Sequence, residues 1–260
     1  GLAPRGNLDF GLTPTEPYVN TPHPGALGDA IEHFYEGYYE AAIEEIHQAR
    51  EAGEDSADSY FIEGMAHAYL GDLDAAAAVL NQGLNVNSQF APLHAGLGYV
   101  YYRQGAINQA RIENEIAKEL DPLLIMPYLN LAQDYLAEGN VNAALAEVGA
   151  AKDINEYNVE VLVMEGDVYL AGGRADSATA VGNLAYYIDP ASEAVNLLLA
   201  RGRIALRLYG TAIVQLEDYI DRVNPGSVPA WILLGDAYYR NGQATLALDA
   251  YNWALQLADD

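Results

Sequence analysis

The chain has 260 residues, 51% of them apolar, which is enough for a sizeable core. Its 37 acidic and 12 basic residues give a net charge of −25, which repels phosphate backbones and anionic lipids and excludes nucleic-acid binding. There is no cysteine, so disulfides and thiol chemistry are excluded, and no run of eighteen apolar residues is present to insert into a membrane.

Residues 1–22 differ in composition from the rest of the chain, since their four prolines forbid a long helix. A chain terminus of this kind is disordered by default. However, Leu8, Phe10 and Leu12 alternate with small or polar residues, which places three apolar side chains on one face of an extended segment. We therefore expect an extended N-terminal tail that docks on a partner or on a neighbouring subunit, with five anchors: Leu8, Phe10, Leu12, Tyr18 and Val19.

From His23 onward a pattern with a period of about 34 residues begins. Each period carries two small residues twelve positions apart, such as Gly64 and Ala76 or Gly98 and Ala110, which would let two helices approach closely. A glycine follows seven residues after the first small residue, where the first helix must end, except in the sixth unit, which has Arg207. The pattern predicts seven helix–turn–helix units: 23–56, 57–90, 91–124, 125–158, 159–192, 193–227 and 228–260.

The last unit shows the repeat most fully. It has Trp231, then Leu234 and Gly235, then Tyr238, followed by Ala247, Tyr251 and Ala254, in the order W-x2-L-G-x2-Y…A-x3-F. The stretch 23–260 therefore resembles the tetratricopeptide repeat (TPR) family. The resemblance implies an all-α fold, a right-handed α-solenoid of seven helix–turn–helix units whose concave face is lined by the first helices.

The two ends of this array differ in polarity. The first unit has Asp29 where leucine is usual, as a polar cap would. In the last unit an apolar set is expected to face outward without a cap: Leu248, Trp253, Leu255 and Leu257. An open apolar end associates with other molecules, so we expect another molecule to cover it. The alternative is a chain cut before its cap.

The resemblance also implies which side chains line a concave groove. Basic residues are isolated in this set, so the carboxylate clamp of the chaperone-binding members is not expected. The mostly apolar lining suits an extended segment with alternating apolar anchors. The implied residues are Leu27, Ile31, Phe34, Tyr35, Phe61, Met65, Tyr69, Tyr99, Tyr102, Arg103, Leu129, Gln133, Leu136, Val163, Asp167, Leu170, Leu197, Arg201, Ile204, Ile232, Asp236, Tyr239 and Arg240.

No pattern of catalytic residues is found. His33 and His67 occupy equivalent positions in adjacent units, but an aromatic residue normally fills that position, so packing is favoured over a metal or acid–base pair. The single E-x-x-H, Glu44 to His47, is typical of a surface helix because di-metal carboxylate sites need such motifs in pairs. Phosphate-binding loops and hydrolase motifs are absent. We expect no enzyme, no metal and no cofactor.

Two functions remain. The first is a structural protein that self-associates head to tail, because two different surfaces meeting give a ring or a helical filament. The second is a monomeric scaffold that binds an extended apolar segment of an unrelated protein. The start at Gly1, the lack of cysteine and the acidic surface favour an extracellular or otherwise exported protein, with the cytoplasm as the alternative.

Overall fold

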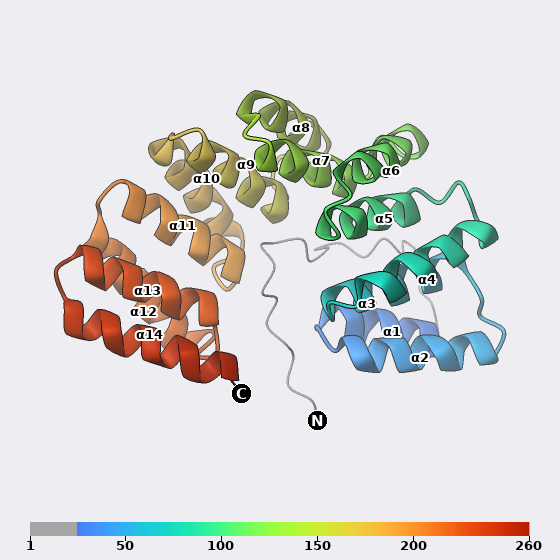
Figure 1. The fold of residues 1–260 in the computed structure, drawn as a ribbon, viewed down its shortest axis with the longest axis horizontal. Coiled ribbons are helices and arrows are strands. Elements are labelled where there is room, and N and C mark those ends of the chain that lie inside the picture. The colour runs from blue at the N-terminus through green and yellow to red at the C-terminus, as the bar shows by residue number, and fades with distance from the viewer. Residues whose placement is uncertain (1–24, 260) are drawn as a thin grey trace. The chain divides into compact units, whose positions relative to one another are not determined.

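A computed structural model of the chain describes residues 25–259, in which every regular element is an α-helix (Figure 1). This confirms the all-α class predicted from the repeat. Consecutive helices pair as antiparallel hairpins, so that each hairpin corresponds to one repeat. The predicted tail, residues 1–22 with its five anchors, lies outside the described residues.

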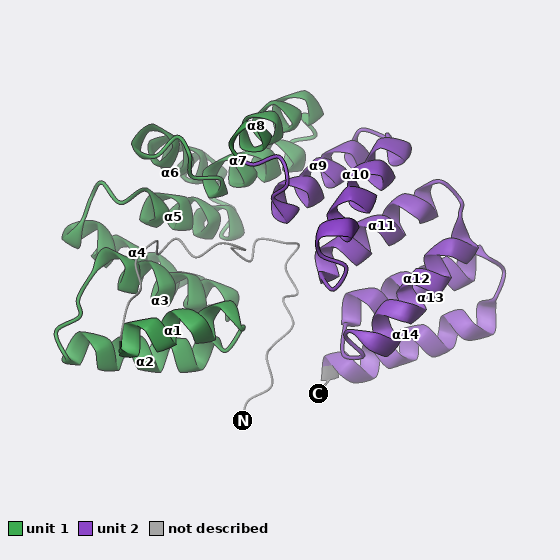
Figure 2. Ribbon diagram, turned by 180° about the vertical axis from the view of Figure 1, so that it is seen from behind, with its two compact units in different colours: residues 1–7, 12–154 green, residues 8–11, 155–260 purple. Residues whose placement is uncertain are grey.

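The described helices fall into two compact units (Figure 2). Within each unit, a helix packs against its hairpin partner and against the next hairpin along the chain. The first unit contains α1 (Ala26–Tyr35), α2 (Tyr39–Glu51), α3 (Ala57–Tyr69), α4 (Leu73–Val86), α5 (Ala91–Arg103), α6 (Ile107–Leu120), α7 (Met126–Ala137) and α8 (Val141–Ile154). The second contains α9 (Val159–Ala171), α10 (Ala175–Ile188), α11 (Glu193–Ala205), α12 (Tyr209–Arg222), α13 (Val228–Arg240) and α14 (Ala244–Asp259).

Each hairpin turns at a residue with left-handed backbone geometry. In the α1–α2 turn Gly37 has φ 84°, and the next residue, Tyr38, donates its backbone N–H to the carbonyl of His33 at 2.8 Å. This satisfies a carbonyl that the end of the helix would otherwise leave without a partner. The sixth hairpin makes the same turn at Arg207, with φ 62°, a conformation that costs a non-glycine residue free energy. The turn position is therefore fixed by geometry even where glycine is missing.

Small residues allow the two helices of a hairpin to touch. A methyl group at Gly98 would overlap the side chain of Asn114, and one at Gly235 would overlap the ring of Tyr251. Both positions were singled out by the repeat pattern. Around these contacts the interior is filled by large apolar side chains such as Phe61, Leu97 and Leu162, which are at most 1% exposed. Burial of each contributes about 1.5–3 kcal/mol, so stacking of hairpins supplies most of the stabilisation.

Candidate functional site

Four large apolar side chains of the last hairpin are exposed on its outer side. Ile232 (45% exposed) and Tyr239 (68%) are seven residues apart on α13, and Leu248 (60%) and Leu255 (62%) are seven residues apart on α14. Seven residues are close to two helical turns, so each pair shares one face of its helix. We call these four residues the α13–α14 face.

In the preceding hairpin, α11–α12, the equivalent face is buried. The repeat-equivalent residues are Leu197 and Ile204 on α11 and Ile213 and Ile220 on α12. Leu197, Ile213 and Ile220 are 3–7% exposed, and Ile204 packs against them, in a core cluster that also holds side chains of α13 and α14. In α11–α12, therefore, this face is the one that packs on the next hairpin. In α13–α14 the same face is exposed within the part of the chain that the structure describes.

The structure separates the residues predicted to form an open end. Leu248 and Leu255 belong to the α13–α14 face. Trp253 (52% exposed) lies on the opposite flank of α14, where its ring stacks on Trp231 with centroids 6.0 Å apart and planes at 24°. Leu257, one turn after Trp253, is half-buried. The repeat pattern predicted that all four side chains face outward, and Leu257 is the one that is half-buried. The pattern did not distinguish the two flanks of the helix.

The residues predicted to line a concave groove differ widely in exposure. Eight are buried between helices: Leu27, Phe34, Phe61, Met65, Tyr99, Leu129, Val163 and Leu197. Another twelve are half-buried: Ile31, Tyr35, Tyr69, Tyr102, Arg103, Gln133, Leu136, Asp167, Leu170, Arg201, Ile204 and Asp236. Ile232, Tyr239 and Arg240 are exposed. The buried members belong to the core of their own units, and the groove as a binding surface stays a prediction.

Two arginines of that set contact other members of it. Arg201 Nη2 lies 2.7 Å from Asp167 Oδ1, and burial raises the pKa of Asp167 while the arginine opposes that rise. Arg103 donates from Nη1 to the hydroxyl oxygen of Tyr99 at 2.7 Å. Arg103 and Arg201 are therefore engaged within the chain. The third arginine of the set, Arg240, is exposed.

Several aromatic side chains of the first unit pack against one another. The ring of Tyr69 lies 5.8 Å from that of Phe34, 5.1 Å from that of Tyr39 and 6.0 Å from that of Tyr99. These are normal separations for packed aromatic pairs. Tyr69 thus connects the second hairpin to the first, through Tyr39, and to the third, through Tyr99, so these tyrosines are packing residues.

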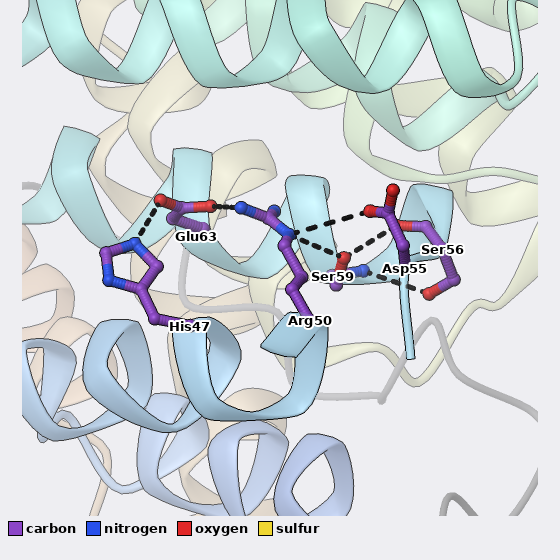
Figure 3. Close-up of polar contacts among 6 residues, drawn as sticks. All are labelled: His47, Arg50, Asp55, Ser56, Ser59 and Glu63. Carbon is purple, nitrogen blue, oxygen red and sulfur yellow. Dashed lines mark hydrogen bonds and ion pairs between the residues drawn. The ribbon is translucent and has the colours of Figure 1, made fainter. Parts of the chain in front are cut away.

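A buried polar cluster between α2 and α3 was not found by sequence reasoning (Figure 3). Glu63, 4% exposed, forms an ion pair with Arg50 and a hydrogen bond with Nε2 of His47 at 2.9 Å. Arg50 also donates to the Ser59 hydroxyl at 3.3 Å and stacks over the ring of Tyr60. The histidine of the E-x-x-H motif thus binds a carboxylate of the next hairpin. A buried charge needs such partners, so the cluster fastens the first hairpin to the second.

His33 is also paired with a carboxylate. His33 Nδ1 lies 2.8 Å from Glu45 Oε2, a hydrogen bond that raises the pKa of the imidazole. Within residues 25–259, no three histidine or acidic side chains are close enough to hold a metal ion. No helix in this range is both long and apolar enough to cross a bilayer. The exposed α13–α14 face is therefore the best candidate for a functional surface.

Comparisons with known proteins agree with this architecture. A family model described as TPR repeat matches residues 64–105, and one described as Tetratricopeptide repeat matches residues 129–193 and 197–260. No curated protein matches in sequence.

Several solved structures share the fold. A chain of the APC/C hetero-tetramer Cut9–Hcn1 is 16% identical with a TM-score of 0.75, over 90% of this chain and 46% of that one. A thermophilic TPR protein of Thermus thermophilus is 19% identical with a TM-score of 0.65, over 71% of this chain and 100% of that one. Yeast Tom70 is 20% identical with a TM-score of 0.66, over 89% and 49%. This chain thus spans about half the length of the first and third. At such identities the likeness concerns the fold alone.

Proposed function

This chain belongs to the tetratricopeptide repeat family, and we propose that it is a scaffold for protein–protein interaction, not an enzyme, whose α13–α14 face docks a helical element of another protein. The observation that supports this is the exposure of Ile232, Tyr239, Leu248 and Leu255, whose equivalents one repeat earlier are packed against the next hairpin. Exposed apolar surface of this kind marks a site of protein association.

A second copy of the chain is the other occupant to consider. In a head-to-tail contact α1 would take the place that α13 takes on α11–α12. There α13 contributes Trp231, Leu234 and Tyr238 to the apolar cluster. The equivalent residues of α1 are Ala26, Asp29 and His33, and Asp29 is exposed. Burying an unpaired carboxylate against leucine costs several kcal/mol. The net charge of −25 also opposes contact between copies.

We therefore place a different protein first and head-to-tail self-association second. Self-association stays a candidate because the α13–α14 face is already shaped to receive a hairpin, and a filament would follow if the contact did not close into a ring. Docking of residues 1–22 on a neighbour and export from the cell also stay predictions. Each of these is separable from the main proposal by experiment.

The test uses Leu248→Asp/Leu255→Asp, which places two charges on the face. Partners captured from a lysate of the source cells by the unmodified chain and by the variant are compared by mass spectrometry. We expect at least one protein to be lost with the variant, and direct titration of that purified protein to show about a hundredfold weaker binding. The control, Leu123→Asp/Val214→Asp, charges two side chains that are 75% and 66% exposed elsewhere, and should retain the partner.

Sedimentation velocity of the unmodified chain over a concentration series separates the two occupants. A species near 28.1 kDa at every concentration indicates a scaffold for another protein. Concentration-dependent growth that Leu248→Asp/Leu255→Asp abolishes indicates self-association. If the chain stays monomeric and no protein is lost selectively with that variant, the face is not a binding surface and the proposal is wrong.

A further inference from the structure

A groove separate from the α13–α14 face lies among α12, α13 and α14, and it has the composition of a cation site. Its volume is about 460 Å³, and its lining includes Trp231 and Trp253 together with the carboxylates of Glu217, Asp221 and Asp249. Leu248 and Leu255 are not part of this lining. The groove therefore lies on the flank of α14 opposite to the face proposed above.

The aromatic wall is built from two indoles. The Trp231 ring is held in place because its Nε1 donates to the carbonyl of Pro225 at 2.9 Å. Trp253 stacks on it and is still 52% exposed. Because Trp253 lines the groove and is half exposed, part of its ring surface is accessible to a ligand there. Indole presents the most favourable ring face for a cation among the aromatic side chains.

The carboxylates provide the matching charge. Tyr238 donates its hydroxyl hydrogen to Glu217, which orients that carboxylate along the groove wall. Asp221 is one helical turn after Glu217 on α12, and Asp249 is one turn before Trp253 on α14. Both aspartates are exposed, and neither forms an ion pair within residues 25–259. Among residues 25–259, no basic side chain lines the groove. Two stacked indoles and three carboxylates thus face a cavity without a counter-charge from the described part of the chain.

We propose that this groove binds the side chain of an arginine carried by a segment of a partner protein. A guanidinium is planar, so it can stack on an indole and donate to a carboxylate in its own plane at the same time. The compact ammonium of lysine gains less, because it is more strongly hydrated and cannot stack. A divalent metal is disfavoured, since the structure groups no three acidic or histidine side chains tightly enough among residues 25–259.

The experiment can be read directly at the site because Trp231 and Trp253 are the two tryptophans of the chain. The full-length protein is labelled with ¹⁵N, and its two indole N–H signals are followed during titration with the peptide acetyl-Gly-Arg-Gly-amide. The titration extends to about 10 mM, where a Kd of ~1 mM approaches saturation. The same peptide with citrulline, which has the shape of arginine without its charge, serves as the neutral comparison.

We expect the arginine peptide to shift both indole signals saturably, and the citrulline and lysine peptides to bind at least about threefold more weakly. Asp221→Asn/Asp249→Asn should weaken binding of the arginine peptide by roughly fivefold. Trp253→Leu, which keeps an apolar side chain but removes the ring, should weaken it by roughly tenfold, read on the remaining Trp231 signal.

The matched control is Glu119→Gln/Asp153→Asn, which also removes two charges from exposed carboxylates but in the first unit. Binding should change less than twofold. Equal weakening by the two double variants would mean that only the overall charge attracts the peptide, and would overturn the site. Absence of indole shifts with the arginine peptide, or equal shifts with citrulline, would also overturn it. Because Leu248 and Leu255 are untouched, either failure leaves the proposed scaffold function standing.

Discussion

At the scale of single residues, Asp134 on α7 stands out because its carboxylate is fully buried and neither oxygen accepts a hydrogen bond within the described residues. Burial raises the pKa of Asp134 to about 7, and the positive charge of Arg111 only partly opposes that rise. The folded chain therefore holds a proton at this site under conditions in which the unfolded chain, with an ordinary carboxyl pKa, has released it.

We predict that this residue makes the protein less stable as pH rises. Between the unfolded pKa, near 4, and the folded value of about 7, the native state binds more protons, so the free energy of unfolding falls with increasing pH. Relative to the unmodified chain, Asp134→Asn should gain roughly 1–3 kcal/mol between pH 4.5 and 8. Urea unfolding at a series of pH values measures this difference, and a constant difference over the range would contradict the prediction.

A second group, His94, also makes the free energy of unfolding fall as pH rises, but the cause is a hydrogen bond and not burial. Its hydrogen bond to Glu113, 2.6 Å long, raises the pKa of the imidazole despite burial. The stability that this pair contributes is present below the unfolded pKa of about 6.5 and is lost as pH rises through the folded value. His94→Gln should remove only the part of the pH dependence above about 6.5. The two contributions can thus be separated.

At the scale of elements, the turn between α11 and α12 is the place where the repeat departs from its own rule. Arg207 has φ 62° where the other hairpins that the structure describes have glycine with φ between 71° and 86°. We predict that Arg207→Gly stabilises the chain by about 0.5–1 kcal/mol, because relief of the left-handed backbone outweighs the greater freedom of glycine in the unfolded state. Thermal and urea unfolding would measure the change.

The opposite substitution, replacing glycine, can be made at a turn that follows the repeat pattern. Gly173, with φ 71°, occupies the corresponding position after α9, and a methyl group there would meet no atom within 4 Å. Gly173→Ala should therefore destabilise through the backbone alone, by about 1 kcal/mol. If Arg207→Gly were neutral while Gly173→Ala was costly, contacts of the Arg207 side chain would have to compensate the strain.

At the scale of the whole molecule, the net charge of −25 is the dominant electrostatic property. Repulsion among like charges destabilises a compact state, and salt screens it. We predict that the free energy of unfolding rises when NaCl is increased from about 10 to 200 mM, because repulsion outweighs the few exposed ion pairs. Calorimetry over a salt series tests this, and a falling Tm would show that exposed ion pairs such as Arg222–Asp218 dominate instead.

The sequence by itself determined the repeat, its seven helix–turn–helix units and the all-α class. These depend on residues whose meaning is local: glycine where the backbone must turn left-handed, and a small side chain where two helices touch. Gly37 and Gly98 could be assigned such roles without coordinates, because any chain that follows the pattern needs them. The positions of Leu248 and Leu255 as outward-facing residues followed from the same periodicity.

Only the tertiary structure decided which of the remaining side chains share a surface. The pairing of Arg50 with Glu63 and the burial of Tyr99 depend on contacts between different hairpins. The stacking of Trp253 on Trp231 depends on how the two helices of the last hairpin pack. The repeat pattern specifies neither kind of contact. The distances and angles of those contacts are set by how neighbouring helices pack. For this reason the α13–α14 face and the groove lined by Trp231 and Trp253, which lie on opposite flanks of α14, became distinct only once the helices were in place.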